Sequence, residues 1–122
     1  MGLSTDSSGI SRELKRLARA NKKVEEKALQ KAAEMVAAEL RSNTPVDPES
    51  KGKHLKDNVV IGTAKDGEIQ IGYAKEVAWR AHFVEMGTIK QRPQGFIQRT
   101  QESMQEEVMR LLEAEIRRGL GL

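Results

Sequence analysis

An Asp-Gly pair between two apolar runs constrains the fold of this chain more than any other feature. Asp66-Gly67 is typical of a two-residue hairpin turn, because both residue types tolerate the left-handed backbone that such a turn requires. The residues from Lys56 to Thr63 have the composition of a strand, and apolar and polar residues alternate from Ile69 to Tyr73. The pattern predicts an antiparallel hairpin that turns one apolar face toward a core.

Patterns typical of amphipathic helices stand on both sides of this hairpin. The first runs from Ile10 to about Arg41 with an interruption at Asn21, and Thr44-Pro45 ends it, because proline disfavours helical geometry in the residue before it. The second follows Pro93 and ends before Gly119. The apolar positions at helical spacing are Ile10, Leu14, Leu17, Val24, Ala28, Ala32, Met35 and Val36, and then Phe96, Ile97, Thr100, Met104, Val108, Leu111, Leu112 and Ile116.

The remaining segments complete the expected architecture. Residues 1–9 are small and polar and predict a flexible tail, and residues 45–54 have the composition of a loop. Residues 76–86 predict a short helix and residues 88–92 a further strand. Residues 10–122 then form one α+β domain: a long N-terminal helix, a small antiparallel sheet of three to four strands, a short helix and a C-terminal helix, with the helices against one face of the sheet.

Composition excludes several classes of protein. The 122 residues suffice for one domain with a real core, and the chain has no cysteine, which excludes disulfides, thiolate metal sites and cysteine nucleophiles. The sequence holds no apolar run long enough to cross a bilayer and does not begin with the apolar block of a secretion signal, so a membrane role is not expected. No nucleophile-base pair, phosphate-binding glycine loop or pair of carboxylates forms a pattern typical of an enzyme.

The positive charge of the chain is unevenly distributed. The net charge is +3, but residues 12–31 alone hold eight basic and three acidic side chains. These residues are either an ordinary solvated helix face or a surface that contacts DNA or an acidic protein. No aromatic side chain lies among them, so stacking with single-stranded nucleic acid is not supported.

Large apolar side chains gather around one glutamate between Val77 and Thr88. As a helix this segment places Val77, Ala81 and Val84 on one side and Trp79, Phe83 and Met86 on the opposite side. The same residues also alternate as in a half-buried strand, and the glycine after them suits either ending. A helix with two apolar faces can bury only one in its own core, which predicts that another layer or another copy of the molecule covers the second.

Five short motifs occur in order between residues 43 and 97. They are Asn43-Thr44-Pro45-Val46-Asp47, Gly52-Lys53-His54-Leu55, Ile69-Gln70-Ile71-Gly72, Phe83-Val84-Glu85-Met86-Gly87-Thr88 and Gly95-Phe96-Ile97. In this order they resemble the head-tail joining proteins, also called tail-completion or neck proteins, of long-tailed bacteriophages. The fourth motif is the most specific. The chain departs from the family pattern at residues 48–51, which lengthen a turn that is usually tight, and around Phe96, which lacks the usual flanking prolines.

The resemblance implies a structural role. A small α+β subunit forms a ring, expected to be a hexamer, between the head connector of the virion and its tail tube, with no catalysis and no cofactor. Its expected partners are further copies of itself, portal-side or head-completion proteins and the tail-tube protein, and it is made in the cytoplasm of the bacterial host. The resemblance also favours a short helix that ends at Glu85.

Candidate residues follow from these arguments. Glu85 needs a partner if neighbours cover it, and Gly87 is expected to adopt a backbone conformation that other residues avoid. His82 and Glu85 lack a third ligand, so a metal site is not expected. The expected interface residues are Trp79, His82, Phe83, Glu85 and Met86; the turn residues are Pro45, Asp47, Gly52, Gly87 and Thr88; and the candidates for a DNA channel or a partner contact are Lys90, Arg92 and Arg99. The alternative function is a DNA-binding module that uses the basic helix at residues 12–31.

Overall fold

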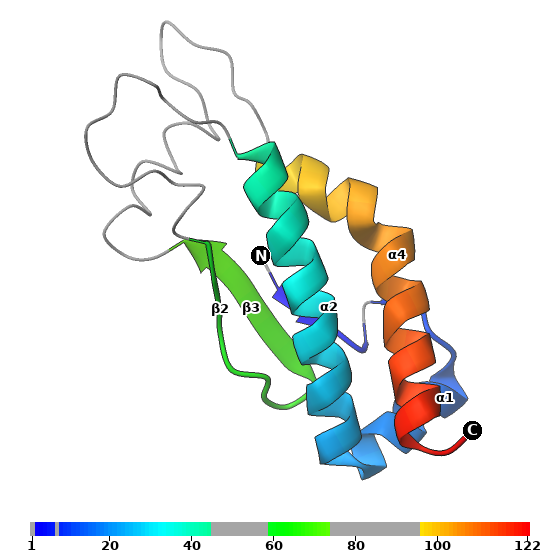
Figure 1. Cartoon of the computed structure of the whole chain (residues 1–122). Helices are drawn as coiled ribbons and strands as arrows, with labels where there is room; N and C mark the ends of the chain where they lie inside the picture. The colour runs from blue at the N-terminus through cyan, green and yellow to red at the C-terminus, as the bar shows by residue number, and fades with distance from the viewer. Residues whose placement is uncertain (1, 7, 45–58, 74–95) are drawn as a thin grey trace, which may run out of the picture.

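The computed structural model describes residues 2–6, 8–44, 59–73 and 96–122, and of residues 96 and 97 the backbone alone (Figure 1). In chain order the described elements are β1 (Gly2–Ser4), α1 (Arg12–Ala20), α2 (Lys22–Asn43), β2 (Val59–Ile61), β3 (Glu68–Tyr73) and α4 (Phe96–Gly119). The α+β class predicted from the sequence is therefore confirmed. The short helix expected at residues 76–86 and the strand expected at residues 88–92 lie outside the described residues.

The predicted hairpin turn is confirmed in detail. Asp66 and Gly67 both have positive φ angles, 52° and 76°, as a two-residue turn of this kind requires. Lys65 and Glu68 on either side exchange two backbone hydrogen bonds, of 2.9 and 3.0 Å. The turn sets the register in which Ile61 pairs with Ile71 and Val59 pairs with Tyr73, so Val59, Ile69 and Ile71 enter the core while Val60 stays 47% exposed.

The third strand of the sheet comes from the N-terminal segment. β1 pairs antiparallel with β3, with Leu3 opposite Ile69, and the strand order is β1-β3-β2. This differs from the flexible tail expected for residues 1–9. The difference has a physical cause: Thr5 is fully buried, and its backbone N–H donates to the carbonyl of Gly67 at 3.2 Å, which holds the segment against the hairpin turn.

The expected interruption at Asn21 separates two helices. The Asn21 backbone N–H donates to the carbonyl of Ala18 at 3.0 Å and closes α1, while its side chain accepts a hydrogen bond from the N–H of Val24 at 3.4 Å and caps α2. Asparagine competes with the helical backbone through such local hydrogen bonds. The long N-terminal helical stretch expected from Ile10 to about Arg41 is thus divided at Asn21 into α1 and α2, and Ile10 is buried just before α1 begins.

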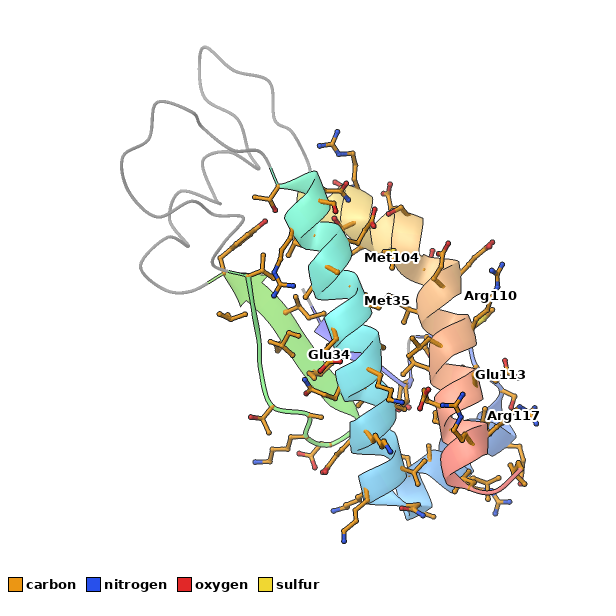
Figure 2. The ribbon with its side chains drawn as sticks, viewed as in Figure 1. Glu34, Met35, Met104, Arg110, Glu113 and Arg117 are labelled. Atoms are coloured by element: carbon orange, nitrogen blue, oxygen red, sulfur yellow. The ribbon has the colours of Figure 1, made fainter. Side chains whose placement is uncertain are left out.

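Helix α2 is the central element of the core. It contacts all three strands, and it also packs against α1 and along α4 (Figure 1). Four alanines on its buried side are fully enclosed and let its neighbours approach closely: Ala28, Ala32, Ala33 and Ala37. Helix α4 runs antiparallel to α2 and adds Val108, Leu112 and Ile116 to the core, as its sequence pattern predicts. Figure 2 shows Met35 and Met104 where the two helices face each other, partly buried against this core.

Candidate functional site

Most of the residues singled out from the sequence lie outside the described part of the chain. They belong to two segments, residues 45–58 and 74–95, which contain Pro45, Asp47, Gly52, Trp79, His82, Phe83, Glu85, Met86, Gly87, Thr88, Lys90 and Arg92. Arg99 alone among the candidates is described, and it is exposed near the start of α4.

The described residues that flank these two segments lie together at one end of the fold. Val59, which begins β2, pairs with Tyr73, which ends β3. The hydroxyl oxygens of Tyr73 and Thr44 are 2.9 Å apart, and the Asn43 side-chain amide donates to the hydroxyl of Thr100 at 2.9 Å. We call Asn43, Thr44, Val59, Tyr73 and Thr100 the junction end. Both segments therefore join the described fold at the same end (Figure 1).

The polar side chains of the junction end form two hydrogen-bonded pairs, Thr44 with Tyr73 and Asn43 with Thr100. The Thr44 hydroxyl donates to the carbonyl of Leu40 at 2.6 Å, and since it has a single proton it accepts from the hydroxyl of Tyr73. Thr44 is in the extended conformation that the following proline favours, and it ends α2. Thr44 and Thr100 are buried, at 4% and 0% exposure, so these bonds also satisfy groups that water cannot reach. These hydrogen bonds link the end of α2 to the end of β3 and to the first turns of α4.

A groove lies between β1 and the first half of α4. Its volume is about 320 Å³, its floor is apolar, and its rim is made mostly of amides and hydroxyls. The floor is lined by Leu3, Val36, Met104 and Val108, and the rim by Ser4, Ser8, Gln101, Glu102 and Gln105. This groove could not be predicted from the sequence, because it depends on β1. The only signal for it in residues 1–9 is the one internal apolar residue, Leu3.

Helix α1, the start of α2 and the end of α4 lie together at the opposite end of the fold, and all three contain basic residues (Figure 1). The last residue of α4, Gly119, faces Val24 near the start of α2, and an added Cβ at Gly119 would lie only 2.6 Å from the Val24 side chain. This close approach brings Arg117 and Arg118 to the end where α1 and the first turns of α2 lie. The charge of residues 12–31 is visible in the sequence, but the contribution of α4 is not, because tertiary packing alone brings α4 to this end.

The described residues contain neither a side-chain cluster typical of a metal site nor a helix that could cross a membrane. Within residues 2–6, 8–44, 59–73 and 96–122, no three histidine, aspartate or glutamate side chains converge as they would around a metal ion. The two histidines, His54 and His82, lie outside these ranges. In the same part of the chain no helix combines the length and the apolar character needed to span a bilayer.

Comparison with known proteins identifies the family. Residues 8–87 match the family model described as "Bacteriophage HK97-gp10, putative tail-component". The match covers more than half of the chain, so this protein belongs to the HK97-gp10-like family, a family of bacteriophage tail components. The matched residues include α1, α2, β2, β3, the first three of the five motifs and the fourth as far as Gly87, while the motif at residues 95–97 lies beyond them. No curated protein and no solved structure matches the chain.

The match confirms the resemblance to phage head-tail joining and tail-completion proteins at the level of the family. The protein is a structural component of a phage tail, and its place is the virion. Nothing in the family description indicates catalysis.

Proposed function

We propose that this chain is the subunit of an oligomeric ring that joins the head connector of a long-tailed phage to its tail. The observation that carries the proposal is the family match over residues 8–87, since it extends to Gly87 of the motif that is most specific for joining proteins, Phe83-Val84-Glu85-Met86-Gly87-Thr88. The ring, expected to be a hexamer, acts by presenting one surface to the portal-side proteins and another to the tail tube, without catalysis.

The subunit interface is proposed to lie in the segment between β3 and α4. Head-to-tail rings need two different patches on each subunit, and a segment with apolar side chains on two sides supplies one patch for its own core and one for a neighbour. The residues proposed for this contact are Trp79, His82, Phe83, Glu85 and Met86, with Gly87 and Thr88 forming the turn that follows. Lys90, Arg92 and Arg99 are proposed to face the channel through which DNA passes.

The junction end supports this proposal. Segments 45–58 and 74–95 leave the described fold beside the hydrogen-bonded group of Asn43, Thr44, Tyr73 and Thr100. A subunit in a ring must hold its contact segments at a fixed place relative to its core. Hydrogen bonds to the buried residues Thr44 and Thr100 at the points of attachment provide such a base.

Electron microscopy of particles tests the proposal. Deletion of the gene from its phage or prophage is expected to yield DNA-filled heads and separate tails after induction, because nothing then bridges the two. Complementation with the wild-type gene should restore joined particles, while Gly87→Val should not, since valine is strained at the left-handed conformation proposed there.

Gly72→Ala provides the matched control for this experiment. Gly72 lies in β3 with no atom within 4 Å of an added Cβ, so this variant should complement fully. Joined, DNA-filled particles in the deletion strain would contradict the proposed function.

A further inference from the structure

The end of the molecule opposite the junction end holds the whole positive excess of the chain. We define the basic end as α1, α2 as far as Lys31, and α4 from Glu113 to Gly119. It contains ten basic and five acidic residues, while the rest of the chain contains eleven basic and thirteen acidic residues. The net charge of +3 therefore originates entirely at this end.

Ion pairs within the described residues use only half of these ten cations. Arg16 pairs with Glu13, Arg19 with Glu25, Arg117 with Glu113, and both Lys31 and Arg118 with Glu115. Figure 2 shows Glu113 and Arg117 on the outer side of α4. The other five cations form no ion pair in the part of the chain that the structure describes; they are Arg12, Lys15, Lys22, Lys23 and Lys27. Four of the five are exposed, and Lys15 is half-buried.

Helix stability does not explain where these cations lie. Arg12 is the first residue of α1, and Lys22 and Lys23 are the first two residues of α2. The N-terminal turn of a helix carries the positive end of the helix dipole, so a cation there is unfavourable where a carboxylate would stabilise. Three such placements on neighbouring elements indicate that the charge serves an external partner.

The composition of the basic end favours phosphate over a protein partner. Protein interfaces have cores enriched in aromatic residues and depleted of lysine. The basic end contains five lysines and no aromatic residue, and Leu122, just beyond α4, is the only large hydrophobic residue near it that is exposed among the described residues. The lack of aromatic residues also argues against single strands, which bind by stacking. We propose that the basic end is a contact surface for the phosphate backbone of duplex DNA, independent of base sequence.

Fluorescence anisotropy with a short fluorescein-labelled DNA duplex of mixed sequence tests this inference on the full-length protein. The wild type should bind, with an affinity that falls steeply between about 50 and 200 mM salt, because binding to phosphates releases counterions. The double variant Lys22→Gln/Lys23→Gln should bind on the order of tenfold more weakly at the lower salt concentration. Its slope of log affinity against log salt should be shallower by roughly 2, since about one unit is lost for each phosphate contact.

The double variant Arg41→Gln/Arg110→Gln is the matched control. It removes the same amount of charge from exposed positions outside the basic end and should leave binding close to that of the wild type. Thermal melting shows whether each variant is folded, and Lys22→Gln/Lys23→Gln is expected to melt no lower than the wild type. Absence of binding at low salt, or equal weakening by both variants, would overturn the inference. Either result leaves the joining function untouched, because particle morphology tests that function separately.

Discussion

Glu25 shows how a single carboxylate can hold several segments together. Its side chain is buried in the first turn of α2, at 3% exposure, and it accepts a hydrogen bond from the Thr5 hydroxyl at 3.1 Å. The Nε atom of Arg19 lies 3.5 Å from the same carboxylate oxygen, and Arg19 also donates to the Asp66 carbonyl at 2.9 Å. The N-terminal segment and both N-terminal helices thus meet at Glu25, and Arg19 connects the hairpin turn to the same network.

Replacement of Thr5 by valine tests this network. Thr5→Val keeps the shape of the side chain but removes the donor to Glu25, so a buried carboxylate loses one of its partners. We expect a loss of about 1–3 kcal/mol in the free energy of unfolding, measured by urea denaturation. Thr63→Val at an exposed position is the control and should change stability by less than about 0.5 kcal/mol. Equal stability of Thr5→Val and wild type would show that the network contributes nothing.

Residues with a strong local preference could be predicted from the sequence. Asp66-Gly67 forms the turn that its dipeptide predicts, and Asn21 interrupts the helix as expected, because both effects depend on neighbouring backbone atoms. Thr5 could not be predicted as a buried residue. Its partners are Glu25 and Gly67, far away in the sequence, and a threonine among small polar residues gives no local signal of such contacts.

At the level of elements, helices and strands with a long periodic sequence pattern could be predicted, and a strand of three residues could not. Helices α2 and α4 and strand β3 have enough apolar repeats to show their period, and their buried positions agree with those repeats. Strand β1 has three residues, of which only Leu3 faces the core side, so no alternation is visible. Tertiary pairing with β3 creates this strand.

The contact between α2 and α4 is expected to supply much of the stability of the fold. Leu112 is fully buried. The buried alanines of α2 already let the helices pack closely, so the helices can move little to fill the cavity that a smaller side chain at position 112 would leave. Leu112→Ala should therefore lower the free energy of unfolding by about 2–5 kcal/mol, measured by chemical denaturation. Leu122→Ala is the matched control, because this leucine is 68% exposed, and it should have almost no effect. A small effect of Leu112→Ala would mean that α4 contributes little to the core.

On the scale of the whole molecule, the described fold has two distinct ends. The junction end anchors the two segments that contain nearly all the proposed interface residues, and the basic end concentrates the positive charge. The motifs of the segments and the charge of residues 12–31 were visible in the sequence. The sequence did not show that Arg117 and Arg118 lie beside that charge. Their position depends on the antiparallel packing of α4 along α2, which places Gly119 next to Val24.

The position of this protein in the assembled virion tests the account most directly. A histidine tag placed after Leu122, which is exposed, can be labelled with nickel-coupled gold on intact particles and located by electron microscopy. If the protein joins head to tail, gold is expected only at the junction of head and tail, in a ring of constant position from particle to particle. Gold along the tail tube or at the distal tail tip would show a tail component that does not join head to tail, and would contradict the account.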